Sequence, residues 1–303
     1  MIEWFNNLDV NVRVVIISSL TSLLIFFIGW IFKFIYERIS LTFKLKKQFQ
    51  FEQNKKLKEE IAKNKIHLLN AVESLNQRMW NFNQNIHQNW HKKTENEWFS
   101  TEDQYYINSF IYRFLCFIYW TLKTEKDTIS VDTTIASKED ITYLKWVKTF
   151  KDIFTDADLL AELNYNKADN TNHFYKNHLI GYTKLLIHNN RVLDFDEFEI
   201  KLRDNYTSLK KIIEYFSTIE DNNNDKNLNV LMCYHLLGIK FLNDYGHDYQ
   251  FTNSEKLKRV ISLYNPKLLI RKSFKEFIKK SKLEKEMRVI TKKLRHYPTK
   301  CVS

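Results

Sequence analysis

Glycine and proline are nearly absent from this sequence, which contains four glycines and two prolines among 303 residues. Doubly wound and all-β folds place these residues at their many turns, where the backbone kinks or becomes left-handed. The chain has too few of them for either class. Long helices joined by polar loops are therefore expected, and the predicted fold class is all-α.

Aromatic residues are abundant, with 23 Phe, 16 Tyr and 7 Trp making up 15% of the chain. They supply enough large apolar side chains for a packed core, so the many Lys and Asn residues do not indicate disorder. The three cysteines, Cys116, Cys233 and Cys301, are an odd number without CxxC spacing. This pattern predicts neither a disulfide framework nor a zinc site, and no cofactor is expected.

Residues 14–32 form a run of nineteen residues without a charged side chain. As a helix the run would extend about 28 Å, which matches the hydrocarbon core of a bilayer. Trp30 and Tyr36 suit a membrane interface. The preceding residues lack the basic region and small-residue cleavage site of a signal peptide. A retained transmembrane anchor over residues 14–36 is predicted, after a short extracytoplasmic segment, residues 1–13.

The charges that follow the anchor predict its orientation. Positions 33–47 hold one acidic residue, Glu37, and five basic ones: Lys33, Arg38, Lys44, Lys46 and Lys47. Positively charged flanks stay in the cytoplasm. The expected location is the cell inner membrane, with a single span, the N-terminus outside and the C-terminal domain in the cytoplasm.

Residues 105–122 form a second apolar stretch, but Arg113 lies at its centre. An arginine at the middle of a bilayer costs at least about 3 kcal/mol. A buried core helix is therefore favoured over a second span. A charge inside an aromatic helix is expected to meet a carboxylate, and the candidates are Glu125, Asp127, Asp132 and Asp156.

Residues 41–98 are predicted to form a helical stalk. Six of its apolar residues alternate at spacings of four and three, which is the seam of a short coiled coil: Leu68, Val72, Leu75, Met79, Phe82 and Ile86. The same seam could instead pack on the chain's own helices. Residues 99–253 are predicted to form a cytosolic helical bundle. Capping boxes at Thr101, Asp194 and Thr252 predict helix starts in the bundle and at the following tail.

The tail, residues 254–303, carries the basic charge of the chain. From Glu255 onward there are sixteen Lys and Arg against four Glu, a net +12, whereas residues 1–254 hold 31 basic and 32 acidic groups, a net −1. Pro266 should divide the tail into a short helix and one longer helix. A solvated surface, anionic lipid binding and nucleic-acid binding remain open, with lipid favoured over nucleic acid. The residues predicted to bind the membrane or another polyanion are Lys272, Lys275, Lys279 and Lys282.

No nucleotide-binding loop or hydrolase motif occurs in the sequence. The densest polar region lies between Arg113 and His178. Carboxylates with histidines can bind a metal or transfer protons. The candidate catalytic residues are therefore Arg113, Asp127, Asp132 and His173, although a structural role is favoured for them and no metal ligands are assigned.

The predicted layout is a single span followed by a stalk, a helical domain and a basic tail. It resembles the layout of small membrane-anchored effectors and scaffolds of bacterial stress and phage defence, and this resemblance of architecture assigns no residues. A non-enzymatic cytosolic effector or scaffold is expected, which self-associates or binds a protein partner at the membrane. The alternative is a membrane-tethered nucleic-acid-binding protein or metal-dependent hydrolase that uses the polar residues between positions 113 and 178.

Overall fold

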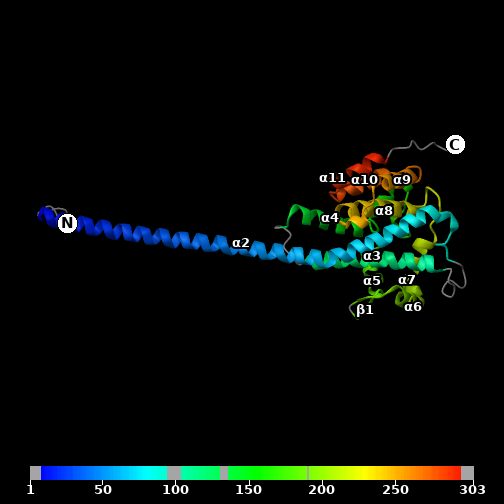
Figure 1. Ribbon diagram of the computed structural model, residues 1–303, viewed down its shortest axis with the longest axis horizontal. Helices are drawn as coiled ribbons and strands as arrows, with labels where there is room; N and C mark the ends of the chain where they lie inside the picture. The colour runs from blue at the N-terminus through cyan, green and yellow to red at the C-terminus, as the bar shows by residue number, and fades with distance from the viewer. Residues whose placement is uncertain (1–7, 94–103, 130–135, 190, 295–303) are drawn as a thin grey trace. The chain divides into compact units, whose positions relative to one another are not determined.

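The chain is mainly helical. The computed structural model describes residues 8–93, 104–129, 136–189 and 191–294 (Figure 1). Across these ranges the elements are α-helices and 3₁₀ helices, apart from one antiparallel pair of two-residue strands, β1 (Ile187–His188) and β2 (Arg191–Val192). The prediction of an all-α class is confirmed.

The elements keep the labels of Figure 1. The α-helices are α2 (Val10–Asn85), α3 (Tyr105–Ile129), α4 (Lys138–Asp152), α5 (Lys176–Lys184), α6 (Phe195–Asp204), α7 (Tyr206–Ser217), α8 (Lys226–Tyr245), α9 (Ser254–Tyr264), α10 (Arg271–Lys280) and α11 (Glu284–Lys293). The 3₁₀ helices are η1 (Ile86–Gln88), η4 (Ala157–Leu163), η5 (Lys167–Asp169) and η6 (Asp248–Gln250).

The chain divides into two units, residues 1–56 and 57–303. The first unit contains the N-terminal part of α2, which is long and apolar enough to cross a membrane by length and composition. None of its most apolar stretch is buried. This part of α2 is therefore not a core helix of the folded chain.

The core of the second unit surrounds α8. This helix is buried along nearly its whole length and packs against α4, α11 and η4. α3 packs against α4, α5, α6 and α7 (Figure 1) and buries a row of aromatic side chains that includes Phe110, Phe114 and Phe117. The burial of α3 agrees with the prediction of a core helix rather than a second span.

The C-terminal part of α2 belongs to this core. All six residues of the predicted seam, from Leu68 to Ile86, are buried against the chain's own helices. Of the two alternatives for the seam, packing within the chain is the one observed. Its side chains are therefore not available to a partner helix.

Capping signals locate helix starts to within one residue. Asp194 caps α6 in a capping box with Glu197, as predicted. The N-cap of α9 is Asn253, so the prediction of Thr252 is wrong by one residue. The predicted box at Thr101 lies outside the described residues.

The described part of the basic segment, residues 254–294, folds into three helices rather than two. Pro266 separates α9 from the rest, as predicted, but the predicted long second helix is divided into α10 and α11. Lys282 lies between them with a φ of 56°. The N–H of Leu283 donates to the Ile278 carbonyl at 3.1 Å, which is the Schellman arrangement that ends a helix with a left-handed residue. Glycine usually occupies this position, so a lysine there gives no signal in the sequence.

Candidate functional site

Arg113 lies on α3 and is half-buried, but it pairs with none of the predicted carboxylates that lie in the described ranges, so the prediction is wrong for these residues. Its Nη1 donates to the backbone carbonyl of Ser74 at 2.8 Å. No ion pair joins Arg113 to a carboxylate within the described ranges, and the candidate partner Asp132 lies outside them. Burial lowers the pKa of Arg113, and the nearby charge of Arg78 lowers it further.

Two other expected partners of Arg113 are held by lysines instead. Glu125 binds Lys151, a buried lysine of α4. Asp156 accepts a hydrogen bond from Lys280 at 2.8 Å. The first pair connects α3 with α4 and the second connects the start of η4 with α10, so both stabilise the packing of helices.

Asp127 also connects helices. Its Oδ2 accepts hydrogen bonds from Lys123 Nζ at 3.0 Å and from Asn64 Nδ2 at 3.0 Å, and Asn64 is a fully buried residue of α2. Burial alone would raise the pKa of Asp127, but these two hydrogen bonds and the charges of Lys123 and Lys63 together outweigh it, so the pKa lies below the usual value. A carboxylate held ionised in this way is a poor proton acceptor.

His173 is buried in a separate group of aromatic residues. Its Nδ1 lies 2.8 Å from the hydroxyl of Tyr165, and its ring meets that of Tyr175 edge to face. Burial lowers the pKa of His173, and the charge of Lys211 lowers it further, so both favour the neutral ring. Arg113, Asp127 and His173 therefore each bind different neighbours and do not bind one another. No group of three or more His, Cys, Asp or Glu side chains in the described chain is arranged to hold a metal ion.

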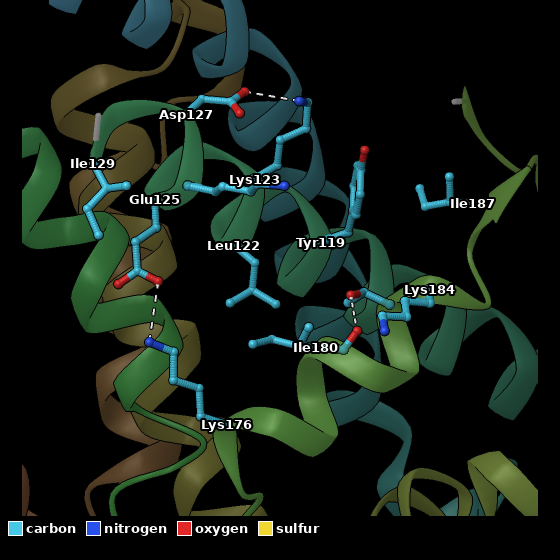
Figure 2. A pocket seen from close by; sticks show the side chains of 12 residues that line it. Tyr119, Leu122, Lys123, Glu125, Asp127, Ile129, Lys176, Ile180, Lys184 and Ile187 are labelled. Atoms are coloured by element: carbon cyan, nitrogen blue, oxygen red, sulfur yellow. Dashed lines mark hydrogen bonds and ion pairs between the residues drawn. The ribbon is translucent and has the colours of Figure 1, made fainter. Parts of the chain in front are cut away.

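A groove between α3, α5 and β1 contains two of the carboxylates described above (Figure 2). It has a volume of about 530 Å³, and its lining consists of Tyr119, Leu122, Lys123, Glu125, Lys126, Asp127, Ile129, Lys176, Ile180, Thr183, Lys184 and Ile187. Figure 2 shows Asp127 paired with Lys123, and Glu125 paired with Lys176 at 4.0 Å. The two carboxylates of the groove are already paired with lysines. The apolar walls and the remaining lysines suit a ligand that has an apolar part and a negative charge.

The predicted polyanion-binding residues lie on the surface of α10 and in the turn after it. Lys272, Lys279 and Lys282 are exposed and Lys275 is half-buried, while Phe274 on the opposite side of α10 is buried. None of the four lysines forms an ion pair with a residue in the described part of the chain. Their charges are therefore free to meet an external anion, as the prediction requires.

Arg78 is a buried cation that the sequence analysis did not identify. It is 8% exposed, its Nη2 donates to the hydroxyl of Ser109, and its guanidinium lies 4.3 Å from the ring centre of Tyr106. A signal was present, because Arg78 lies between Leu75 and Phe82 on the buried face of α2.

The described residues thus define an all-α protein with an exposed apolar helical segment and a basic surface. No family model, curated protein or solved structure matches the chain.

Proposed function

We propose that residues 14–36 anchor the protein in the cell inner membrane and that its helical domain acts in the cytoplasm as a non-enzymatic effector or scaffold. The observation that carries this proposal is the exposure of the apolar segment of α2. Nearly all its large side chains are exposed, up to 73% for Tyr36. A soluble protein rarely exposes a contiguous apolar surface of this extent.

A bilayer is a suitable environment for this segment. The hydrocarbon core is about 30 Å thick and requires about 20 apolar residues in a helix. A helix also satisfies its own backbone hydrogen bonds, which is required where no water is present. The basic residues of positions 33–47 favour a cytoplasmic location for everything that follows.

Self-association is supported by a second set of exposed apolar residues on α2. Leu41, Phe43, Leu45, Phe49 and Phe51 are each more than half exposed. They follow the anchor and therefore lie beyond the stretch of roughly 20 residues that one bilayer covers. The same segment of a second copy would cover them, and replacing Phe43 and Phe49 with Ser should reduce chemical cross-linking between copies in membranes.

A non-enzymatic role is supported by the partners of the candidate catalytic residues. Asp127 is bonded to Lys123 and Asn64, and His173 to Tyr165. These bonds use the polar groups for contacts within the fold. The predicted layout resembles that of stress and phage-defence effectors. A phage-challenge assay with the intact protein would test a role in defence.

The basic surface of α10 is proposed to bind anionic lipid. Each basic group near an anionic leaflet contributes about 1 kcal/mol. The experiment uses the full chain in nanodiscs of neutral or anionic lipid, with the reactivity of individual lysines toward an acylating reagent as the readout. Lys272, Lys275, Lys279 and Lys282 should be protected only on the anionic discs.

A charge-matched control separates this surface from a general effect of charge. The test variant changes Lys272, Lys275, Lys279 and Lys282 to Glu, and the control changes four exposed lysines elsewhere to Glu: Lys138, Lys184, Lys201 and Lys210. In both variants the readout is the protection of a nearby exposed lysine that neither variant changes, Lys285 of α11, and only the test variant should lose the difference in its reactivity between the two lipid compositions. Protection by RNA or DNA on neutral discs, without protection by anionic lipid, would favour the nucleic-acid alternative.

A further inference from the structure

Arg78 and Arg113 bring two positive charges together between α2 and α3. Both lie beside Tyr105: the Arg78 guanidinium lies 6.0 Å from the ring centre of Tyr105 and 4.3 Å from that of Tyr106, and Arg113 interacts with the side chain of Tyr105. Neither arginine forms an ion pair with a carboxylate anywhere in the described chain. The Nε of Arg78 is buried without a hydrogen-bond partner there.

Such an arrangement is unfavourable unless another charge is present. A desolvated guanidinium costs free energy, and two like charges in a medium of low polarity repel each other. Buried charges in proteins are normally paired. Lys151 follows this rule, since it is buried and binds Glu125.

The groups around the two arginines suit one kind of ligand. Guanidinium groups donate parallel hydrogen bonds that match the geometry of phosphate oxygens. The two positive charges match a phosphate dianion. The hydroxyl of Tyr105, on the same side of α3, can donate a further hydrogen bond, whereas those of Tyr106 and Ser109 already donate to Asn81 Oδ1 and to the Tyr106 carbonyl.

We propose that Arg78 and Arg113 form a binding site for a phosphoryl group, which supplies a negative charge that no carboxylate in the described ranges supplies at this position. The half-buried Arg113 provides the solvent-accessible side of the site, and the buried Arg78 provides its fixed inner donor. The site lies on a different part of the domain from the lysines of α10 and does not depend on the membrane function proposed above.

The experiment measures the melting temperature of the full chain in neutral detergent, with inorganic phosphate or pyrophosphate compared with chloride at equal ionic strength. Phosphate should raise the melting temperature, because a ligand that binds only the folded state stabilises it. Arg113→Gln should weaken phosphate binding about tenfold or more, and Arg113→Lys should restore it only in part. Arg259→Gln, which removes an exposed arginine of α9, is the control and should bind phosphate like the parent.

A purely structural role for Arg113 predicts a different result. If the two arginines repel each other in the free protein, Arg113→Gln should melt no lower than the parent in chloride and should lose only the increase caused by phosphate. A lower melting temperature in chloride with an unchanged phosphate effect would overturn the proposal.

Two arms of the experiment distinguish the source of the phosphoryl group. Stabilisation by inorganic phosphate or pyrophosphate in neutral detergent indicates a soluble phosphorylated molecule. Stabilisation only in nanodiscs that contain phosphatidic acid, again lost in Arg113→Gln, indicates a lipid headgroup. No stabilisation in either arm, or equal loss in Arg259→Gln, would overturn the site.

Discussion

Gly238 is expected to be required where α8 crosses α2. A Cβ atom at this position would lie 2.8 Å from Nδ2 and 2.9 Å from Cγ of Asn76, and closer still to its Oδ1. Ordinary contacts between such atoms are about 3.5 Å or longer. Asn76 is 7% exposed, and neither polar atom of its amide has a hydrogen-bond partner in the described chain. Gly238→Ala therefore forces a buried side chain to move.

The expected magnitude combines two opposing effects. Overpacking of a core position costs about 1–3 kcal/mol. Alanine in place of glycine inside a helix contributes about 1 kcal/mol of stability. Gly238→Ala alone should thus lower the free energy of unfolding by about 0–2 kcal/mol. When Asn76 is also Ala, the clash is absent and Gly238→Ala should raise the free energy of unfolding by about 1 kcal/mol.

A double-mutant cycle measured by denaturant unfolding of the full chain in neutral detergent tests this reasoning. The coupling between Gly238→Ala and Asn76→Ala should be about 1–3 kcal/mol, with the double variant more stable than the sum of the single changes predicts. If Gly238→Ala has the same effect in both backgrounds, the close approach of the two helices is not a constraint and the reasoning fails.

Three further predictions concern pH, a helix end and topology. Burial lowers the pKa of His235 to about 3. As the pH falls below about 6.5, the unfolded chain therefore takes up a proton at His235 before the folded chain does, which lowers the free energy of unfolding. Between pH 7.5 and 5, His235→Gln should lose about 2 kcal/mol less stability than the parent. An unchanged pH profile would show that the ring is not buried. Lys282→Gly should raise the free energy of unfolding by about 1 kcal/mol because glycine adopts a positive φ without strain, and a loss of stability would contradict the left-handed turn. A reporter fused at Ser303 that works only in the cytoplasm should be active, whereas periplasmic activity would exclude the proposed orientation.

Local signals in the sequence predicted much of the fold. The scarcity of glycine and proline excluded the turn-rich classes, and the apolar spacing of Leu68 to Ile86 located a buried face of α2. Asp194 and Glu197 marked a helix start because a capping box involves neighbouring residues alone. These features depend on interactions within a few residues of the chain.

Pairings between distant residues could not be read in the same way. Arg113 was expected near a carboxylate, but Ser74 is its partner, and Lys151 rather than Arg113 takes Glu125. Which of several charged residues meet depends on how helices pack. The number of charged residues can be counted in the sequence, but their partners cannot.

The distinction between paired and unpaired buried charges indicates where to search for a ligand in this protein. A buried pair such as Lys151 and Glu125 balances desolvation against mutual attraction and is complete within the fold. Arg78 and Arg113 donate to a hydroxyl and a carbonyl but pair with no carboxylate in the described ranges, so an opposite charge there does not offset their desolvation and mutual repulsion. Selection removes such a cost easily, since an apolar residue of similar size can replace a buried charge with little loss or even a gain of stability. Two arginines in this arrangement are better explained by an anion that binds them than by the stability of the fold.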